Sequence, residues 1–180
     1  MSQDEVSNRT DPPLAADEAT TLPAFLDFHR DTLRWKTSDL DGAQLARTLP
    51  PSDMTLGGMI KHLAVVESSW FSEVFLGEDL MPPFDTAPWD SDRDWEWHSA
   101  HADSPEYLSS LLDEAIERSR RITTELLASQ GLDALSVGTD RGTGERYSLR
   151  WVLVHMIEEY ARHNGHADLI RQSIDGAVGE

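Results

Sequence analysis

The chain of 180 residues contains no cysteine, and this absence removes several classes of chemistry at once. Disulfide bonds, zinc ribbons and catalytic protein thiols all need cysteine side chains, so none of them is open to this protein. A metal site in this chain must therefore use nitrogen and oxygen ligands. Its seven histidines and 33 acidic residues are the candidates for such ligands.

Long apolar runs are also absent. The longest span only a few residues, whereas a membrane-spanning helix needs about 20. The first residues, MSQDEVSNRTDPPLAADEA, include no apolar stretch of the kind found in signal peptides. We therefore expect a cytoplasmic protein that has no membrane partner.

Positive charge is scarce: 15 lysines and arginines stand against 33 acidic residues, which gives a net charge of −18. Such a surface repels phosphate backbones and anionic lipids, so nucleic acid is not an expected partner. The imbalance is strongest between Glu78 and Glu106, where Arg93 is the only basic residue. We expect that stretch to be mostly solvated.

Apolar residues recur with helical spacing in four segments, and no segment shows a convincing strand alternation. These segments are roughly 21–37, 52–77, 104–131 and 148–175. Ser52 or Asp53, Ser104 and Ser148 are the expected N-caps of the last three, while Gly77, Gly131 and Gly176 mark their ends. The pattern predicts an all-α bundle in one domain, 21–176, after a polar arm at 1–20.

The connection between the second and third predicted helices is unusually long. Residues 80–103 form an irregular segment with three prolines and three tryptophans, Trp89, Trp95 and Trp97. A connection of this length in a compact domain is usually a lid, a binding loop or an interface. The sequence leaves a lid and an interface equally open.

Three residues form a candidate metal site. Glu159 and His163 lie four residues apart beside the centre of the apolar stripe of the last predicted helix, and His62 lies within the apolar stripe of the second. Without a partner, a buried carboxylate beside an imidazole costs several kcal/mol. One shared cation would satisfy all three groups, and three protein ligands leave a coordination position open for chemistry.

The alternative is that Glu159 and His163 are an ordinary i, i+4 helix pair, and spacing alone favours it. Two further histidines of the last helix, His155 and His166, could act as acid/base groups, hydrogen-bond donors to the ligands or an alternative ligand, although an ordinary packing role is the more common one. Glu67 is a minor candidate: it could orient a neighbouring group by hydrogen bonding, or it could be an ordinary surface carboxylate on the flank of its helix. His29 is expected to be packed, and His98 and His101 to be exposed.

Two motifs carry a family resemblance: GGMIKHLAVVESSWF at 57–71 and LRWVLVHMIEEYARHNGHADLIRQSIDG at 149–176. The chain resembles the DinB/YfiT-like superfamily of metalloenzymes, and more closely its actinobacterial branch of unknown function. The resemblance spans about residues 23–176. It implies a four-helix up-down bundle with long crossing connections.

The same resemblance implies a divalent metal, zinc or nickel, held by His62, Glu159 and His163. Many members have three histidines. Glu159 at the middle position departs from that pattern but is similar to the His, Glu, His set of the mycothiol-dependent maleylpyruvate isomerases. Members often look dimeric, and the tryptophans of 80–103 would suit a homodimer interface.

A thiol-dependent S-transferase or isomerase is the function that these observations favour. Its co-substrates would be a small thiol such as mycothiol and an electrophile, and a metal-coordinated thiol loses its proton readily, so no protein cysteine is needed. A metal-dependent hydrolase using the same open position is the alternative enzyme. A non-catalytic stress-response or interaction protein is the alternative outside enzymes.

Overall fold

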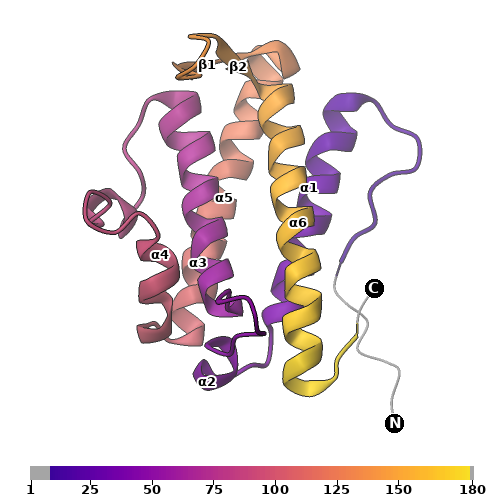
Figure 1. The fold of residues 1–180 in the computed structure, drawn as a ribbon. Coiled ribbons are helices and arrows are strands. Elements are labelled where there is room, and N and C mark those ends of the chain that lie inside the picture. Colours follow the sequence, from indigo (N-terminus) through magenta and orange to yellow (C-terminus); the bar gives the residue numbers. More distant parts are fainter. Residues whose placement is uncertain (1–8, 179–180) are drawn as a thin grey trace.

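The computed structural model describes residues 9–178 and is mostly helical (Figure 1). The helical elements in chain order are α1 (Glu18–Thr37), α2 (Gly42–Leu45), α3 (Leu56–Glu67), the π-helix η1 (Ser68–Leu76), η2 (Phe84–Thr86), α4 (Trp95–Ser99), η3 (Ala100–Ala102), α5 (Pro105–Ser129), η4 (Gly131–Asp133) and α6 (Leu149–Asp175). A two-stranded sheet, β1 (Leu135–Thr139) and β2 (Arg146–Ser148), precedes α6. No helix among the described residues is long and apolar enough to span a membrane.

The polar arm predicted at 1–20 falls partly on residues 1–8, which lie outside the described part of the chain. α1 begins at Glu18, slightly earlier than predicted, because the Asp17 side chain accepts a backbone hydrogen bond in the first turn. Upstream of this cap, the Arg9 guanidinium lies 4.7 Å from the centre of the Trp35 ring. Residues before α1 therefore contact the helical part of the molecule.

Side-chain caps define where the long helices begin. Ser104 and Ser148 cap α5 and α6 as predicted, each accepting a hydrogen bond from the backbone N–H three residues on. The predicted cap of the second long helix at Ser52 or Asp53 is wrong. Thr55 caps α3 instead and accepts a hydrogen bond from Gly58 N, while Ser52 Oγ accepts from Met54 N before the helix begins.

The second long helix continues from α3 without a break into the π-helix η1. It ends at Gly77, as predicted, where the backbone is left-handed with a φ of 72°. Glycine adopts this conformation without the steric cost of a side chain. The segment that then leads to α5 is less irregular than predicted, because it contains η2, α4 and η3.

The turn-rich stretch before α6 forms a β-hairpin, which corrects the expectation that the chain has no strand. β1 and β2 pair antiparallel, with Leu135 opposite Ser148. Asp140 shapes the turn, because its side chain accepts hydrogen bonds from the backbone N–H groups of Gly142 and Thr143. Strands of five and three residues are too short for an alternating pattern to be recognised in the sequence.

α3 and α5 run in the same direction. Gly57, at the start of α3, lies against Leu108 near the start of α5, and Arg118 further along α5 pairs with Glu78 just after η1. The crossover between Gly77 and Ser104 makes this possible, because it returns along the length of the helices (Figure 1). The structure therefore departs from the strict alternation of helix direction in an up-down bundle.

α1 and α6 pack side by side and also run in one direction, opposite to α3 and α5. Arg150 at the start of α6 pairs with Glu18 at the start of α1, and Arg171 near its end donates to the carbonyl oxygen of Lys36. α6 lies between α1 and α3 in Figure 1. This arrangement brings the middle of α6 beside the middle of α3.

The apolar core lies between these four long helices. The residues that α6 contributes to it include Val152, Met156, Tyr160, Ala167 and Ile170. It also encloses an ionic group. Glu67 of α3 is fully buried and accepts two hydrogen bonds of 2.7 Å from the Arg30 guanidinium of α1. The Tyr160 hydroxyl donates to the same carboxylate at 2.9 Å.

This geometry decides between the two roles considered for Glu67. It is not a surface carboxylate on the flank of α3; it joins three helices through their side chains. Burial, and then the charge of Glu67, raises the pKa of Tyr160 well above its usual value, so Tyr160 remains a hydrogen-bond donor. Burial alone would lower the pKa of Arg30, but the charge and hydrogen bonds of Glu67 outweigh it and raise that pKa.

Replacing Glu67 by glutamine should lower the free energy of unfolding by about 3–5 kcal/mol, because it removes the buried counter-charge of Arg30 and leaves only the partly exposed Asp27. The matched control is Glu158→Gln, which removes an exposed carboxylate from an i, i+4 pair with Arg162 on α6. That change should cost no more than about 0.5 kcal/mol. Urea unfolding measures both, and equal effects would contradict the role given to Glu67.

Candidate metal centre

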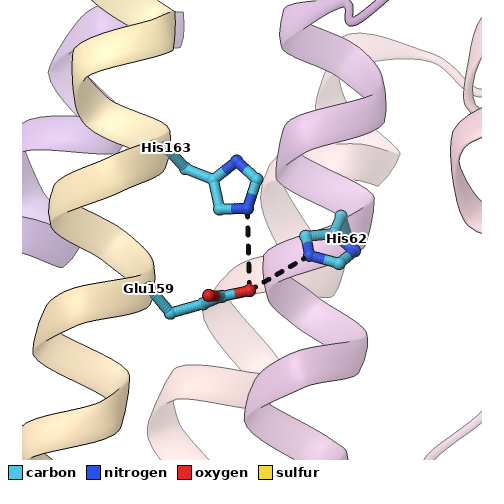
Figure 2. A group of neighbouring side chains, drawn as sticks. All are labelled: His62, Glu159 and His163. Carbon is cyan, nitrogen blue, oxygen red and sulfur yellow. Dashed lines mark ion pairs between the residues drawn. The ribbon is translucent and has the colours of Figure 1, made fainter.

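His62 of α3 and Glu159 and His163 of α6 converge in the structure, as the sequence predicts they would (Figure 2). One ligand atom from each residue lies within 4.8 Å of the others. His62 Nε2 is 3.5 Å from Glu159 Oε1, and His163 Nε2 is 3.7 Å from the same oxygen. Glu159 and His163 are one turn apart on α6, and His62 faces both of them from the antiparallel helix α3.

The two distances from Glu159 Oε1 to the histidine nitrogens are closer to those around a shared divalent cation than to those of direct hydrogen bonds. Separations of 3.5 and 3.7 Å are longer than a normal N–H···O bond. Tetrahedral bonds of about 2.0–2.2 Å would place neighbouring ligand atoms about 3.3–3.6 Å apart. Two imidazole nitrogens and one carboxylate oxygen are donors that zinc and nickel accept, so His62, Glu159 and His163 could hold such an ion.

Electrostatics keep His163 ready to act as a ligand. Burial, together with the nearby His62, lowers its pKa to about 4, although Glu159 acts in the opposite direction. The ring is therefore neutral at pH 7, which is the state in which an imidazole binds a metal. Its other nitrogen, Nδ1, is buried and has no hydrogen-bond partner among the described residues.

Glu96 of α4 completes the surroundings of His62, and the sequence analysis did not identify it. Glu96 Oε1 lies 3.0 Å from His62 Nδ1, and the glutamate is only 6% exposed. A carboxylate at this distance accepts the Nδ1 proton of a neutral ring, which leaves Nε2 free to bind a cation on the Glu159 side. Glu96 therefore orients His62 and selects its tautomer.

Trp97, the next residue, packs against the ring of His62. Its ring stacks on His62 with 4.9 Å between the ring centres and 29° between the planes. This approach depends on Gly58, because a Cβ at that position would lie 2.5 Å from Trp97 Cε3. Any other residue at 58 would push the tryptophan away from α3.

α4 is attached to α3 by a buried lysine as well. Lys61 is 2% exposed, and its ammonium group donates to Ser99 Oγ at 2.8 Å and to Asp103 Oδ2 at 2.6 Å. The segment at 80–103, which the sequence leaves as either a lid or an interface, is thus fixed against the helix that carries His62. The acidic, tryptophan-rich composition was visible in the sequence, but its partners on α3 were not.

The two candidate acid/base histidines have different surroundings. The His166 ring lies 5.7 Å from that of His163, and its buried Nδ1 has no hydrogen-bond partner among the described residues. His155 stacks on Trp151 with 5.0 Å between ring centres and also contacts Trp70. Among the described residues, neither histidine belongs to the group of converging ligand atoms.

The remaining histidines lie away from these ligand atoms. His98 and His101 are exposed, as predicted, and His98 pairs with Asp92 at 2.9 Å. His29 on α1 is partly buried, and its carbonyl oxygen accepts a hydrogen bond from the side chain of Asn164. None of the three is among the converging ligand atoms.

His163 and His98 should titrate on opposite sides of the usual histidine pKa of about 6.5. In metal-free protein, NMR should show His163 neutral until the pH approaches 4, because its pKa is lowered to about 4 by burial. His98 should become protonated above pH 6.5, because its hydrogen bond to Asp92 raises its pKa. The unfolded chain binds the His163 proton at higher pH than the folded one, so this residue's stabilising contribution is complete above pH 6.5 and falls toward pH 4. His163 titrating above His98 would contradict this.

Replacing Glu96 by leucine should weaken zinc binding about 10- to 100-fold, because His62 then loses the acceptor that orients it. Glu96→Gln retains an acceptor oxygen and should weaken binding less. Glu125→Leu removes an exposed carboxylate from α5 and should leave the affinity unchanged. Competition against a chromophoric chelator measures all three, and equal affinities for the two Glu96 variants and the control would refute the positioning role.

Comparison with known proteins identifies a family that matches the part of the chain containing the candidate metal centre. A search of curated proteins finds no match. A family model described as "MST: Mycothiol-S-transferase" matches residues 21–176, which include α3, α6 and all three converging residues. The match also covers nearly every described element of the fold. The chain therefore belongs to the mycothiol-S-transferase family, within the DinB/YfiT-like superfamily.

Proposed function

We propose that this protein is a metal-dependent S-transferase that joins a small thiol, of the mycothiol type, to an electrophilic carbon. The observation that carries the proposal is the convergence of His62, Glu159 and His163 on one point between α3 and α6. The family to which the chain belongs supports the thiol and the transferase reaction. The absence of cysteine is compatible with a nucleophilic sulfur that arrives with a substrate.

Under this proposal His62, Glu159 and His163 hold a zinc or nickel ion. Such an ion supplies Lewis acidity, which lowers the pKa of a thiol bound to it. Glu159 contributes the negative charge of the ligand set, while Glu96 and Trp97 fix the ring of His62. Three protein ligands leave coordination space for a substrate.

The transfer step exchanges one bond to carbon for another. The thiol gives up its S–H proton, sulfur forms a C–S bond to the electrophile, and the leaving group departs with its bonding electron pair. We propose His166 ahead of His155 as the group that moves the proton. His166 lies beside His163, and its Nδ1 has no partner among the described residues, whereas the His155 ring stacks on Trp151 and makes an edge contact with Trp70.

The same three residues could also support the isomerase and hydrolase reactions. A thiol-dependent isomerase would use the same thiol chemistry, and a hydrolase would use water in its place. The family match favours the transferase over both. A purely structural protein has no evident use for two imidazoles and a carboxylate that face one another at distances too long for hydrogen bonds.

We also propose that the four long helices form a four-helix bundle of the DinB/YfiT-like type. The packing of α1 on α6 and of α3 on α5 supports this proposal. The direction of the helices follows the order down, up, up, down, with the crossover between Gly77 and Ser104 joining the two parallel helices. A bundle with one long crossover is an established variant of this architecture.

Metal analysis of the purified protein tests the proposal first. We expect about one equivalent of zinc or nickel in the wild type. His163→Ala should lose most of this metal. Its metal affinity should fall by more than the roughly 10- to 100-fold expected when a hydrogen bond to a ligand is lost. The matched control is His155→Ala, which changes a histidine on the same helix outside the converging group and should retain the metal.

The reaction is tested with mycothiol and an electrophile under the same conditions. Metal-loaded wild type should consume thiol faster than chelator-treated protein, and His163→Ala should behave like the chelator-treated sample. A hydrolase would act on its substrate with the thiol omitted. If the wild type carries little metal and added zinc or nickel fails to raise its melting temperature, the proposal is wrong.

A further inference from the structure

A cavity of about 330 Å³ lies between the second long helix and the crossover segment, and its lining includes Glu96, the partner of His62. Its walls are mostly apolar, with Val65, Val66 and Trp70 on one side and Leu80 and Trp89 on the other. The polar side chains at its edge are Ser69 and Glu96. Its volume is at the lower end of the range for small-molecule sites, which suits an occupant the size of one or two aromatic rings.

The cavity continues the face of the helix that carries His62. Val65 and Val66 follow His62 by three and four residues, and Trp70 follows it by eight, so all three lie on the same side of the helix. Val66 is one helical turn, about 5.4 Å, from His62. Trp70 also contacts His155, which lies one turn before Glu159 on α6. An occupant of the cavity is therefore within reach of the candidate metal centre.

Glu96 belongs to both sites. Its Oε1 pairs with His62, while its Oε2 is buried and has no hydrogen-bond partner among the described residues. A buried carboxylate oxygen without a partner is costly, and a donor on an occupant would remove that cost. The same carboxylate repels anions, as does the protein as a whole with its net charge of −18.

We propose that this cavity binds the electrophilic co-substrate through an uncharged, apolar group of aryl size that carries one hydrogen-bond donor. Trp70, Trp89 and the two valines contact the apolar group, and Glu96 Oε2 accepts from the donor. The electrophilic carbon then lies on the side of the cavity nearest His62. This inference rests on the proposed transferase function and names the class of electrophile that it uses.

Binding of an unreactive probe to the metal-containing protein tests the cavity separately from the reaction. The probe is 1-naphthylmethanol, which has an aromatic body and one hydroxyl donor; naphthalene-1-sulfonate has the same rings but an anionic group that binds metals weakly. Tryptophan fluorescence and calorimetry should show saturable binding of the alcohol, at least tenfold tighter than binding of the sulfonate. Glu96→Gln should bring the two affinities closer together, because it removes the negative charge.

Filling the cavity should abolish this binding. Val66→Trp and Leu80→Trp place a large ring in it from opposite walls and should each weaken binding of the alcohol at least tenfold. Leu169→Trp adds the same ring at an exposed position of α6 that does not line the cavity, and it should bind as the wild type does. Circular dichroism and metal content establish that each variant is folded and loaded.

The outcomes separate this inference from the proposed function. If the wild type binds neither probe, or if a folded, metal-loaded Val66→Trp or Leu80→Trp variant binds the alcohol like the wild type, the cavity is not the electrophile site. Thiol transfer by the metal-loaded wild type would then still stand. Saturable binding that both cavity variants weaken supports the site even where no thiol is consumed, because neither probe reacts with a thiol.

Discussion

A buried contact between Arg30, Glu67 and Tyr160 holds three of the four long helices together. It joins α1, α3 and α6 inside an apolar core, where a charge without a counter-charge is costly. A buried ion pair with hydrogen bonds has one acceptable geometry, so it fixes how far α3 and α6 can slide against each other. Because Tyr160 follows Glu159 directly and Glu67 follows His62 by five residues, the same contact sets the level at which the candidate ligands meet.

The residues of the candidate centre come from two sources, the long helices of the core and the crossover segment. His62, Glu159 and His163 come from two long helices that the core holds in place. Glu96 and Trp97 come from the crossover, which Lys61 and the close approach at Gly58 attach to α3. The parallel arrangement of α3 and α5 is what requires this crossover, so the same feature of the topology also supplies the residues that orient His62.

Charge has two roles in this arrangement. The large excess of carboxylates keeps anions away from the surface, while inside the site each carboxylate has a defined partner or task. Glu67 is neutralised by Arg30, Glu159 faces two imidazoles, and Glu96 pairs with His62 through one oxygen while it also lines the neighbouring cavity. A neutral His163 beside Glu159 suits a cation, and the apolar walls of the cavity suit the uncharged co-substrate that we propose.

Local sequence patterns predict the long helices and most of their ends, and they place His62, Glu159 and His163 where the three side chains could converge. Apolar periodicity and helix caps depend on residues that are close together in the sequence, so they can be recognised without a structure. A polar residue inside an apolar stripe faces the core for the same reason as its apolar neighbours. The two quoted motifs also indicated the superfamily, which the family match supports. Packing between distant segments sets the direction of α5 relative to α3, the pairing of Glu67 with Arg30 and the contact of Glu96 with His62. These contacts join residues 34 and 37 positions apart, and nothing in local spacing specifies which distant side chain will neutralise a buried charge.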